Sequence, residues 1–296
     1  MTEPVLHLLV PYWGEPALLD ATVESVLAQT DPHWSLTIVD DCYPDHTAGE
    51  RYGAHPDPRI RYLRNERNLG TAGNFERCRQ LVEHELAAFP GCDDLLLPDY
   101  VARVRELHLR FPSAAFFQPG VRVVGGDGEE VRGLTERVKA WLAPDGPFPR
   151  MVAGEALATS LLHGNWLYWP SLAFRADVIR DRPFRPDLPI ILDLALILDL
   201  VLSGEQLVVD DHACFAYRRH DASASATARF DGHRFSDEDR FHHEVEQRLD
   251  ALGWRRARRA ARLHATSRLH ALTLLPGVLR SGSREQVREL LRHAVR

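Results

Sequence analysis

The sequence has few cysteines and no long uninterrupted apolar run. Its four cysteines are scattered without a Cys-x-x-Cys pair, which predicts neither a zinc site nor a disulfide framework. The N-terminus, MTEPVLHLLVPYW, has no basic segment and too short an apolar stretch for a signal peptide. The longest apolar segment, residues 189–202, contains Asp193 and Asp199 and is too short to cross a membrane. We therefore expect a soluble protein of the reducing cytoplasm.

The sequence also lacks an excess of positive charge. Its 36 lysines and arginines are outnumbered by 42 aspartates and glutamates, which gives a formal net charge of −6. This balance argues against extensive binding to nucleic acid, so we expect no nucleic-acid partner. The length of 296 residues, 45% hydrophobic and 26% charged, fits one large α/β domain or two smaller ones.

Strand and helix patterns alternate through the first 100 residues. The expected strands are 5–10, 35–39, 59–63 and a weak fourth at 87–89, and the expected helices are 16–30 and 71–86. Strands separated by single helices predict parallel βαβ units, in which ligands bind beyond the carboxyl ends of the strands. Three polar or aromatic segments fall at such ends, which predicts one shared site. These segments are residues 11–14, 40–41 and 91–94.

The rest of the chain continues this domain and then becomes helical. A helix is expected at 99–111, a strand at 114–125, and an apolar helix around Asp193. Residues 126–150 are polar and rich in Gly and Pro, which predicts an excursion or lid over the sheet. From about residue 233 the pattern is helical throughout, with a strongly basic stretch.

An aromatic ring and an acid lie at the ends of the first two strands. Trp13 can stack on a pyrimidine base while Asp41 accepts a hydrogen bond from the base N3–H. Stacking of this kind contributes about 1–3 kcal/mol per base. The alternative is that Trp13 is an aromatic of the core or its rim.

A second acidic pair, Asp93 and Asp94, follows the fourth strand. It can hold Mg²⁺ or Mn²⁺ against a diphosphate, because hard cations take oxygen ligands. The alternative is that both residues cap the next helix. Farther along, Arg218 can neutralise phosphate oxygens and a neutral His220 can be a third metal ligand, unless this segment is simply a solvated basic turn.

Asp193 is an acid in an otherwise apolar helix. Burial should raise its pKa, and a carboxylate held there can serve as a general base. The alternative is that Asp193 and Asp199 form the polar stripe of an amphipathic helix, although a spacing of six places them poorly on one face. The aromatic run at 165–170 either lines an acceptor pocket or packs in the core.

Taken in order, these motifs resemble glycosyltransferase family 2, the inverting nucleotide-sugar enzymes of the GT-A fold. The resemblance covers roughly residues 4–225 and rests on PYWGE, SVLAQT, VDDCYPD, RNERNLGTAGNFERC, GCDDLLLPDYV, FRADVI and YRRHDAS. It implies an α/β, Rossmann-like mixed sheet flanked by helices in a catalytic domain over 1–232. Residues 1–100 would be its nucleotide-binding half and 101–232 its acceptor-binding half, followed by a helical extension at 233–296.

The resemblance also implies a role for each matching position. Asp193 would be the base that deprotonates the acceptor hydroxyl, and Asp94 would ligate Mg²⁺ or Mn²⁺, with His220 helping at the diphosphate. The positions implied around a nucleoside-diphosphate sugar are Pro11, Trp13, Glu15 and Asp41 at the nucleoside, Asn74 near the sugar diphosphate, Asp93 at the ribose or donor sugar, and Arg218 at the diphosphate.

The chain departs from the family pattern at several positions. Trp13 replaces the usual Tyr, Gly14 the usual Asn, and Gly91 the first Asp of the DxD segment. Cys42 and Tyr43 replace a small residue and a Ser, and Leu192 replaces an acid. These changes leave two other functions open: a non-catalytic scaffold that binds nucleotide sugars, and a sugar-1-phosphate nucleotidylyltransferase. The latter usually carries a basic Gly-rich loop after the first strand, which PYWGEPALLD does not.

The resemblance does not settle the partners. The donor is expected to be a UDP- or dTDP-sugar, and the acceptor a saccharide, a lipid-linked sugar or a secondary metabolite. The basic C-terminal helices can lie on an anionic membrane, which would place the protein at the inner face, or mediate a homodimer, or pack on the catalytic domain.

Overall fold

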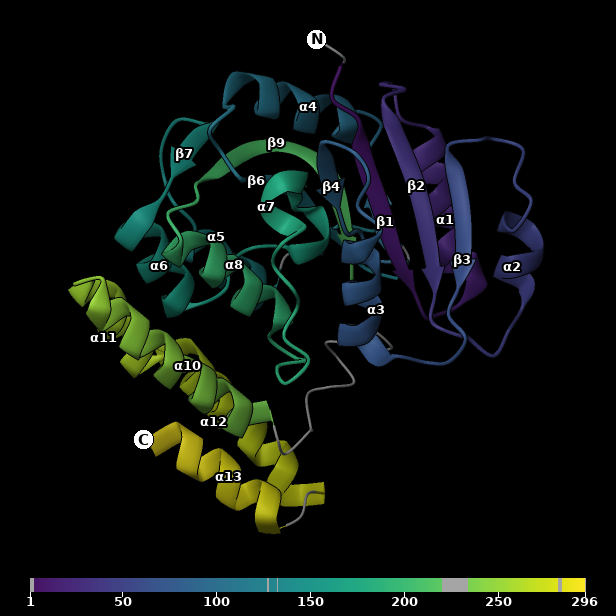
Figure 1. Ribbon diagram of the computed structural model, residues 1–296. Coiled ribbons are helices and arrows are strands. Elements are labelled where there is room, and N and C mark those ends of the chain that lie inside the picture. Colours follow the sequence, from purple (N-terminus) through teal and green to yellow (C-terminus); the bar gives the residue numbers. More distant parts are fainter. Residues whose placement is uncertain (1–2, 127, 132, 220–233, 282–283, 296) are drawn as a thin grey trace.

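The fold is built around one mixed sheet. The computed structural model describes residues 3–126, 128–131, 133–219, 234–281 and 284–295. In this part of the chain the sheet has nine strands in the order β3-β2-β1-β4-β8-β6-β9-β5, with β7 paired to β9 (Figure 1). The strands are β1 Leu6–Tyr12, β2 Trp34–Asp40, β3 Ile60–Arg64, β4 Leu86–Ala88, β5 Leu95–Leu96, β6 Phe116–Val124, β7 Arg150–Val152, β8 Ala173–Arg175 and β9 Leu207–Arg218.

The strands of the N-terminal half are parallel, as the sequence predicts. β1 pairs in parallel with both β2 and β4, and β2 pairs in parallel with β3. β8 then runs antiparallel to β4 and β6, while β5 and β7 run antiparallel to β9. The mixed α/β sheet expected from the resemblance is therefore confirmed.

Helices cover both faces of the sheet, and the strands alternate between two cores. Leu8 and Val10 of β1 face one core with α1, α2 and α4, whereas Leu9 faces the other with α3, α6, α7 and α8. The helices before the C-terminal region are α1 Pro16–Leu27, α2 Thr47–Tyr52, α3 Gly70–Gln80, α4 Tyr100–Arg110, α5 Leu134–Leu142, α6 Gly154–His163, α7 Ala176–Ile179 and α8 Leu192–Leu202, with a short 3₁₀ turn at Trp169–Ser171.

The sequence predicts one helix too long. The helix expected over 71–86 ends at Gln80, because Leu86 belongs to β4 and pairs with Leu6 of β1. Residues 81–86 therefore keep the apolar spacing of a helix in the sequence but are not part of α3. The expected apolar helix around Asp193 is α8, whose other residues are mostly buried, as an all-round apolar helix requires.

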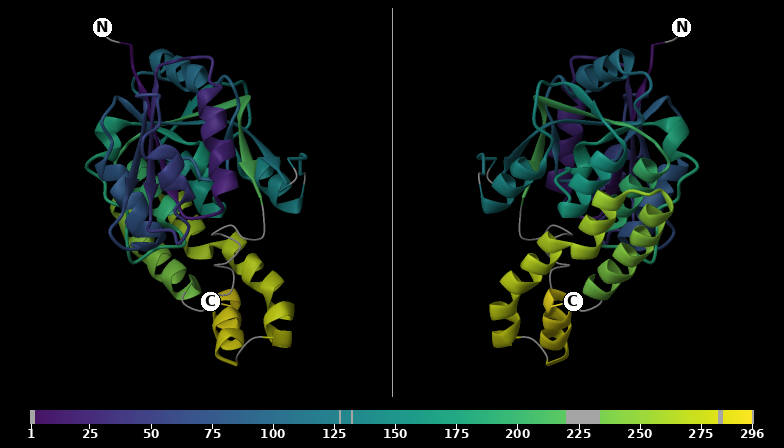
Figure 2. Two further views of the ribbon diagram at one scale, coloured as in Figure 1. Left: turned by 90° about the vertical axis from the view of Figure 1, so that its right-hand side faces the viewer. Right: turned by 90° about the vertical axis from the view of Figure 1, so that its left-hand side faces the viewer.

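The C-terminal region is helical in its described residues, as predicted. It contains α10 Arg234–Ala251, α11 Arg255–Leu263, α12 Ala265–Ser281 and α13 Arg284–Val295. α10 and α11 pack on the main core through Phe241, Val245, Leu249 and Ala257. α12 and α13 project beyond the body of the molecule (Figure 2) and share a small core of their own around Ala271, Val278 and Leu290.

The packing of the C-terminal helices bears on the three roles predicted for them, which are membrane contact, dimerisation and packing on the catalytic domain. Packing of the tail on the catalytic domain, one of the three alternatives, is what α10 and α11 do. In the part of the chain that the structure describes, no helix combines the length and apolarity needed to cross a membrane. Membrane contact or dimerisation through α12 and α13 stays a prediction, as does the domain boundary after residue 232.

Candidate functional site

The carboxyl ends of β1 and β2 bring Trp13 and Asp41 together. The Asp41 amide donates to the Tyr12 carbonyl oxygen at 3.0 Å, so the residues that follow the two strands are neighbours. The Trp13 side chain is 49% exposed and meets Tyr43 edge-on, with ring centroids 5.2 Å apart. Trp13 is therefore no core residue, and its indole is available to a ligand. Pro11 and Glu15 flank the same strand end, half-buried and exposed respectively.

Asp41 is buried and held in one orientation by its neighbours. Its Oδ1 accepts hydrogen bonds from Asn65 Nδ2 and from the Leu69 amide, each at 2.8 Å. Among the described residues both bonds end on Oδ1 and none on Oδ2. One carboxylate oxygen is therefore fixed by the protein, which leaves the other for a ligand donor.

Asn74 supports this arrangement from α3. Its Nδ2 donates to the Val39 carbonyl oxygen at 2.9 Å, and its Oδ1 accepts from Asn65 at 3.0 Å. The Asn74 amide is thus engaged within the protein, and its predicted place near the sugar diphosphate stays a prediction. Asn65 was missed by the sequence analysis, although it follows the end of β3 just as Asp41 follows β2.

Asp40 differs from its neighbour Asp41 because the protein satisfies it completely. It is fully buried, and it accepts hydrogen bonds from the Tyr43 amide at 2.8 Å, from Arg64 Nη1 at 2.6 Å and from the Tyr62 hydroxyl. The next residue, Cys42, has φ of 62°, which turns the chain sharply after the acidic pair. Asp40 therefore supports the turn that presents Asp41.

The second acidic pair, Asp93 and Asp94, crowds around Gly91. A Cβ atom at position 91 would lie 2.6 Å from Asp93 Oδ1 and 2.7 Å from Asp94 Oδ2. Glycine here leaves room for both carboxylates, whereas a side chain would displace them. The alternative that they cap α4 is wrong, because that helix begins at Tyr100 with Asp99 at its N-cap.

Asp94 is buried almost completely, and its environment is unfavourable to a lone negative charge. Burial, and then the neighbouring charge of Asp93, raise its pKa well above the ordinary value for Asp, although the Arg218 amide donates to Oδ1 at 2.9 Å. A divalent cation would relieve this repulsion, and carboxylate oxygens are the ligands that Mg²⁺ and Mn²⁺ prefer. The residues present therefore fit such an ion.

Arg218, the last residue of β9, adds positive charge beside this pair. Its Nε is buried and has no hydrogen-bond partner among the described residues. A buried guanidinium donor without a protein acceptor suits an anionic ligand such as a phosphate oxygen. Arg219 pairs instead with Glu136 of α5 at 2.7 Å. His220, the predicted third metal ligand, lies outside the described residues.

Asp193 lies in the first turn of α8, where Asn165 Nδ2 donates to its Oδ2 at 3.0 Å. Burial raises its pKa above the ordinary value, and the charge of Lys139 partly opposes that rise. Asp193 and Asp199 are both half-buried, whereas residues 194–198 between them are buried, so the polar-stripe alternative stays open. Asp199 forms an ion pair with Arg248 of α10. Asp199 is therefore bound to a neighbouring helix and not simply exposed.

Lys139 of α5 lies close enough to Asp193 for its charge to lower the pKa of that acid. Its Nζ donates to the Leu167 carbonyl oxygen at 2.7 Å and lies 3.9 Å from the centre of the Tyr168 ring. Burial lowers the pKa of Lys139 to about 8. Tyr168 in turn contacts Tyr217, which precedes Arg218, with ring centroids 5.5 Å apart. Lys139 was not predicted as a site residue, because it lies in the polar segment 126–150, which was predicted only as an excursion or lid over the sheet.

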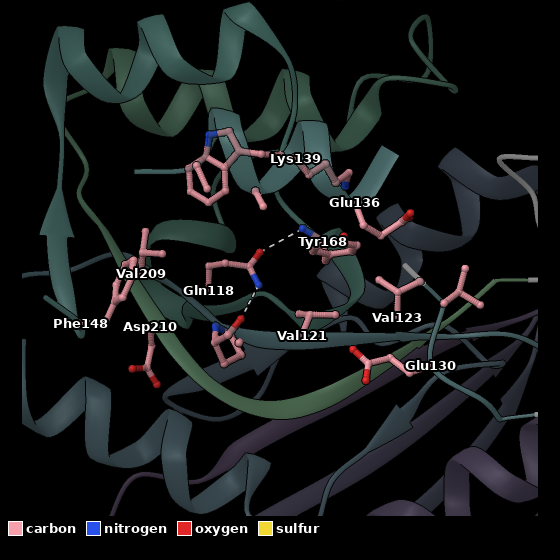
Figure 3. Close-up of a pocket in the computed structure, with 16 residues that line it drawn as sticks. Gln118, Val121, Val123, Glu130, Glu136, Lys139, Phe148, Tyr168, Val209 and Asp210 are labelled. Atoms are coloured by element: carbon pink, nitrogen blue, oxygen red, sulfur yellow. Dashed lines mark hydrogen bonds between the residues drawn. The ribbon is translucent and has the colours of Figure 1, made fainter. Parts of the chain in front are cut away.

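A cavity of about 290 Å³ lies beneath α5, between that helix and the strands β6 and β9 (Figure 3). Gln118 hydrogen-bonds the Tyr168 amide at 3.0 Å within its lining, and Lys139 and Trp166 also line it. Among the described residues, no predicted catalytic, substrate-binding or metal-binding residue lines this cavity. Trp169 of the aromatic run at 165–170 stacks on Phe89 in the core, as one alternative expects, and Trp166 and Tyr168 line the cavity. That this cavity takes an acceptor stays a prediction.

Comparison with known sequences identifies the family. The sequence model of glycosyl transferase family 2 matches residues 8–173, more than half of the chain. The succinoglycan biosynthesis protein ExoO of Rhizobium meliloti (strain 1021) is 26% identical over 230 residues, which cover 77% of this chain and 64% of that protein. The Escherichia coli UDP-Glc:alpha-D-GlcNAc-diphosphoundecaprenol beta-1,3-glucosyltransferase WfgD is 28% identical over 95 residues, or 32% of this chain and 37% of that protein. Across the curated relatives that match, the matched region covers between 12% and 64% of the relative's own length.

Solved structures show the same fold. Staphylococcus aureus TarS 1–349 in complex with UDP-GlcNAc aligns with a TM-score of 0.68 at 13% identity, covering 98% of this chain and 79% of that chain. The mannosyltransferase PcManGT from Pyrobaculum calidifontis, in complex with GDP-Man and Mn²⁺, aligns with a TM-score of 0.62 at 15% identity, covering 99% and 87%. At such identities the likeness confirms the predicted GT-A type fold and nothing finer. Together with this fold, the match over more than half of its length shows that the chain belongs to glycosyl transferase family 2.

Proposed function

We propose that this chain is a metal-assisted, inverting glycosyltransferase that moves one sugar from a UDP- or dTDP-sugar to an acceptor hydroxyl. The observation that carries the proposal is the meeting of Asp93 and Asp94 over Gly91, beside Arg218, whose buried Nε has no hydrogen-bond partner in the described part of the chain. Two carboxylates for a cation and a guanidinium for an anion suit a metal-bound diphosphate better than any apolar ligand.

In this proposal the nucleoside binds at the ends of β1 and β2. The base stacks on the exposed indole of Trp13, and Asp41 accepts its N3–H through Oδ2, because Oδ1 already accepts two hydrogen bonds from the protein. Pro11 and Glu15 line the same edge. A pyrimidine with an N3–H is required for this contact, which favours uracil or thymine over cytosine.

Asp94 and Asp93 hold Mg²⁺ or Mn²⁺, which when bound supplies positive charge against the diphosphate. Arg218 donates to the phosphate oxygens from the other strand end, and His220 assists there. PcManGT is a precedent for a divalent ion with a sugar nucleotide in this fold, since its structure holds GDP-Man and Mn²⁺. Asn74 positions the strand end through Val39 and Asn65.

Asp193 performs the proton transfer. Its carboxylate takes the proton of the acceptor hydroxyl, and the acceptor oxygen forms a bond to the anomeric carbon from the face opposite the diphosphate. The bond between that carbon and the diphosphate oxygen breaks, and its electron pair leaves with the nucleoside diphosphate. The configuration at the anomeric carbon is therefore inverted. Asn165 orients Asp193 by donating to Oδ2.

The cavity under α5 is the proposed acceptor site. Lys139, whose charge interacts with that of Asp193, lines it together with the rings of Trp166 and Tyr168. Aromatic rings pack well against the C–H faces of sugars. Saccharide, lipid-linked and secondary-metabolite acceptors all fit this description.

The test is turnover of a panel of UDP- and dTDP-sugars with Mg²⁺ or Mn²⁺, read as release of nucleoside diphosphate. The proposal expects metal-dependent release from one donor class, and a product whose anomeric configuration, read by NMR coupling constants, is opposite to that of the donor. Nucleotide binding without release in any combination, from a well-folded sample, would instead indicate a non-catalytic scaffold.

A further inference from the structure

The C-terminal helices contain a cluster of metal-ligating side chains far from the strand ends. Asp239 of α10, His264 in the link between α11 and α12, and His293 of α13 converge. One potential ligand atom from each lies within 4.8 Å of the others. His264 and His293 are buried, and Asp239 is half-buried. The three residues come from three separate helical elements, so their meeting is a product of the fold.

The hydrogen bonds around His293 leave a lone pair facing an acid. The Ser267 hydroxyl donates its only proton to Glu238, so its oxygen can only accept from His293 Nε2, 2.9 Å away. A neutral His293 therefore carries its proton on Nε2 and a lone pair on Nδ1. That Nδ1 lies 2.8 Å from Asp239 Oδ1, a separation that either a proton on His293 or a metal ion bound by both atoms accounts for.

His264 directs a second lone pair at the same carboxylate. Its Nδ1 lies 3.1 Å from the Ala261 carbonyl oxygen, which can only accept, so Nδ1 carries the proton. The remaining nitrogen, Nε2, lies 3.5 Å from Asp239 Oδ1. Arg268 Nε also lies 3.3 Å from this Nε2, in a long hydrogen bond that a bound cation would replace.

We propose that Asp239, His264 and His293 bind one divalent transition-metal ion of the zinc class. Two imidazole nitrogens and one carboxylate oxygen suit Zn²⁺, whereas Mg²⁺ and Ca²⁺ prefer oxygen ligands alone. Tetrahedral ligands at zinc distances lie about 3.4 Å from one another. The separation between Asp239 Oδ1 and His264 Nε2 is 3.5 Å, and the 2.8 Å separation between Asp239 Oδ1 and His293 Nδ1 would widen by about 0.6 Å on binding. The hydrogen bond from His293 Nε2 to Ser267 is the kind of outer contact that orients a metal-bound histidine.

The surroundings offer a fourth ligand. A cavity of about 280 Å³ opens beside Asp239 and His264 and has room for water. His242 of α10 also lines it, and its ring stacks on His264 with centroids 4.8 Å apart. Its Nδ1 is buried and has no hydrogen-bond partner in the described residues. This buried imidazole nitrogen belongs to a ring that stacks on His264.

The ion would fasten the α12–α13 pair to the rest of the molecule. α10 is anchored in the main core, whereas the described apolar side chains of α12 and α13 pack around Ala271, Val278 and Leu290, and α13 contacts α10. A metal bound by α10, the α11–α12 link and α13 joins these two units, and its binding free energy becomes stability of the joined state. This role is independent of the proposed transfer reaction and requires no cysteine.

The experiment uses the full chain, stripped with a chelator, dialysed and titrated with Zn²⁺. We expect one Zn²⁺ per chain that survives gel filtration, a higher unfolding temperature with Zn²⁺, and no competition from excess Mg²⁺. Asp239→Asn, His264→Gln and His293→Gln should each weaken Zn²⁺ binding by about 100-fold or more. Co²⁺ loading of the wild type gives a second readout, because tetrahedral coordination produces a strong visible absorption that the variants should lose.

A matched control is His212→Gln on β9, which removes an exposed His–Asp pair with Asp99, the N-cap residue of α4, and should leave Zn²⁺ binding unchanged. Circular dichroism establishes that each variant is folded. No stoichiometric Zn²⁺ in the wild type, or equal retention by the three variants, would overturn the proposal. The 2.8 Å contact would then be an ordinary proton-bridged His–Asp pair.

Discussion

The two acidic pairs of this protein have the same residues and opposite environments. Asp40 and Asp41 meet donors from their own protein, including Arg64, Asn65 and the amides of Tyr43 and Leu69. Asp93 and Asp94 instead converge over Gly91, where burial and mutual repulsion raise the pKa of Asp94. Asp40 forms an ion pair with Arg64 and supports the turn, and Asp41 accepts hydrogen bonds from uncharged donors, whereas Asp93 and Asp94 are the pair at which we propose that a divalent cation binds.

Substitution of a third acid, Asp193, should have the largest effect. It should slow the transfer reaction while leaving the properties of both acidic pairs unchanged. Asp193→Asn keeps the size of the side chain but removes the base, so transfer should slow by about 10²–10⁴-fold. Nucleoside-diphosphate binding should stay within about twofold, since Asp193 belongs to neither pair. Single-turnover rates and calorimetric titration on the same preparation measure the two quantities. Equal losses in both would remove Asp193 from the role of base.

Substitution of Asp40 should damage stability and not metal dependence. Asp40→Asn leaves Arg64 and the Tyr62 hydroxyl with a weaker acceptor in a fully buried position, which should cost about 2–4 kcal/mol of unfolding free energy. Denaturant unfolding measures this loss. The Mn²⁺ dependence of nucleotide binding should survive in the folded fraction, and its disappearance would show that the two pairs are not independent.

Asp94→Asn should remove the metal dependence and should not reduce stability. Without a divalent ion, this substitution should raise the unfolding temperature, because it removes a carboxylate charge that burial disfavours. A gain of about 1 kcal/mol in unfolding free energy corresponds to a rise of about 2–4 °C. The substitution should also abolish the stimulation of nucleotide binding by Mn²⁺. A destabilised variant that still responds to Mn²⁺ would contradict the contrast between the pairs.

The same contrast predicts a dependence on pH. The folded-state pKa of Asp94 is raised above its unfolded value, so its contribution to stability is complete below about pH 4 and is lost as pH rises through the raised pKa. Without divalent ions, the wild type should therefore lose stability relative to Asp94→Asn as pH increases towards neutrality. Mn²⁺ should restore it, since the ion binds the ionised form. If the stabilities of the wild type and Asp94→Asn change in parallel over this pH range, the prediction is refuted.

Gly91→Ala should give the smallest effect. Its Cβ would meet the carboxylate oxygens of Asp93 and Asp94, which must move apart by several tenths of an ångström. We expect Mn²⁺ affinity to fall by about tenfold while stability without metal changes little. A matched substitution at Gly126, where an added Cβ meets nothing within 4 Å, should leave Mn²⁺ affinity unchanged.

The local parts of the fold could be predicted from the sequence. β1, β2 and α1 have clear periodicity, and their order places Trp13 beside Asp41. Strands formed by distant pairing were missed, since two-residue β5 is recognisable only through its partner β9, whose register against β6 shifts near Gly120. Pairing with β1 also ended the helix predicted over 71–86.

The site shows the same division. Asp94 and Asp193 were found because acids stand out in apolar segments, and Asn65 could have been found as the residue after β3. Lys139 could not have been predicted as a site residue, because only the packing of α5 brings it to Tyr168 and Asp193. The cluster of Asp239, His264 and His293 is still more distant in sequence, and the lack of a Cys-x-x-Cys pair directed attention away from any zinc-class site.

The measurement that tests the central contrast most directly is nucleotide binding with and without metal. Thermal-shift titrations of the wild type and Asp94→Asn with UDP, dTDP, CDP and GDP, each with and without Mn²⁺, compare the two pairs in one experiment. We predict a Mn²⁺-dependent shift with UDP or dTDP in the wild type and none in Asp94→Asn. A ligand present at about 100 times its Kd adds roughly 2.7 kcal/mol of stability. A shift that is independent of Mn²⁺, or equal in the two proteins, would contradict the account.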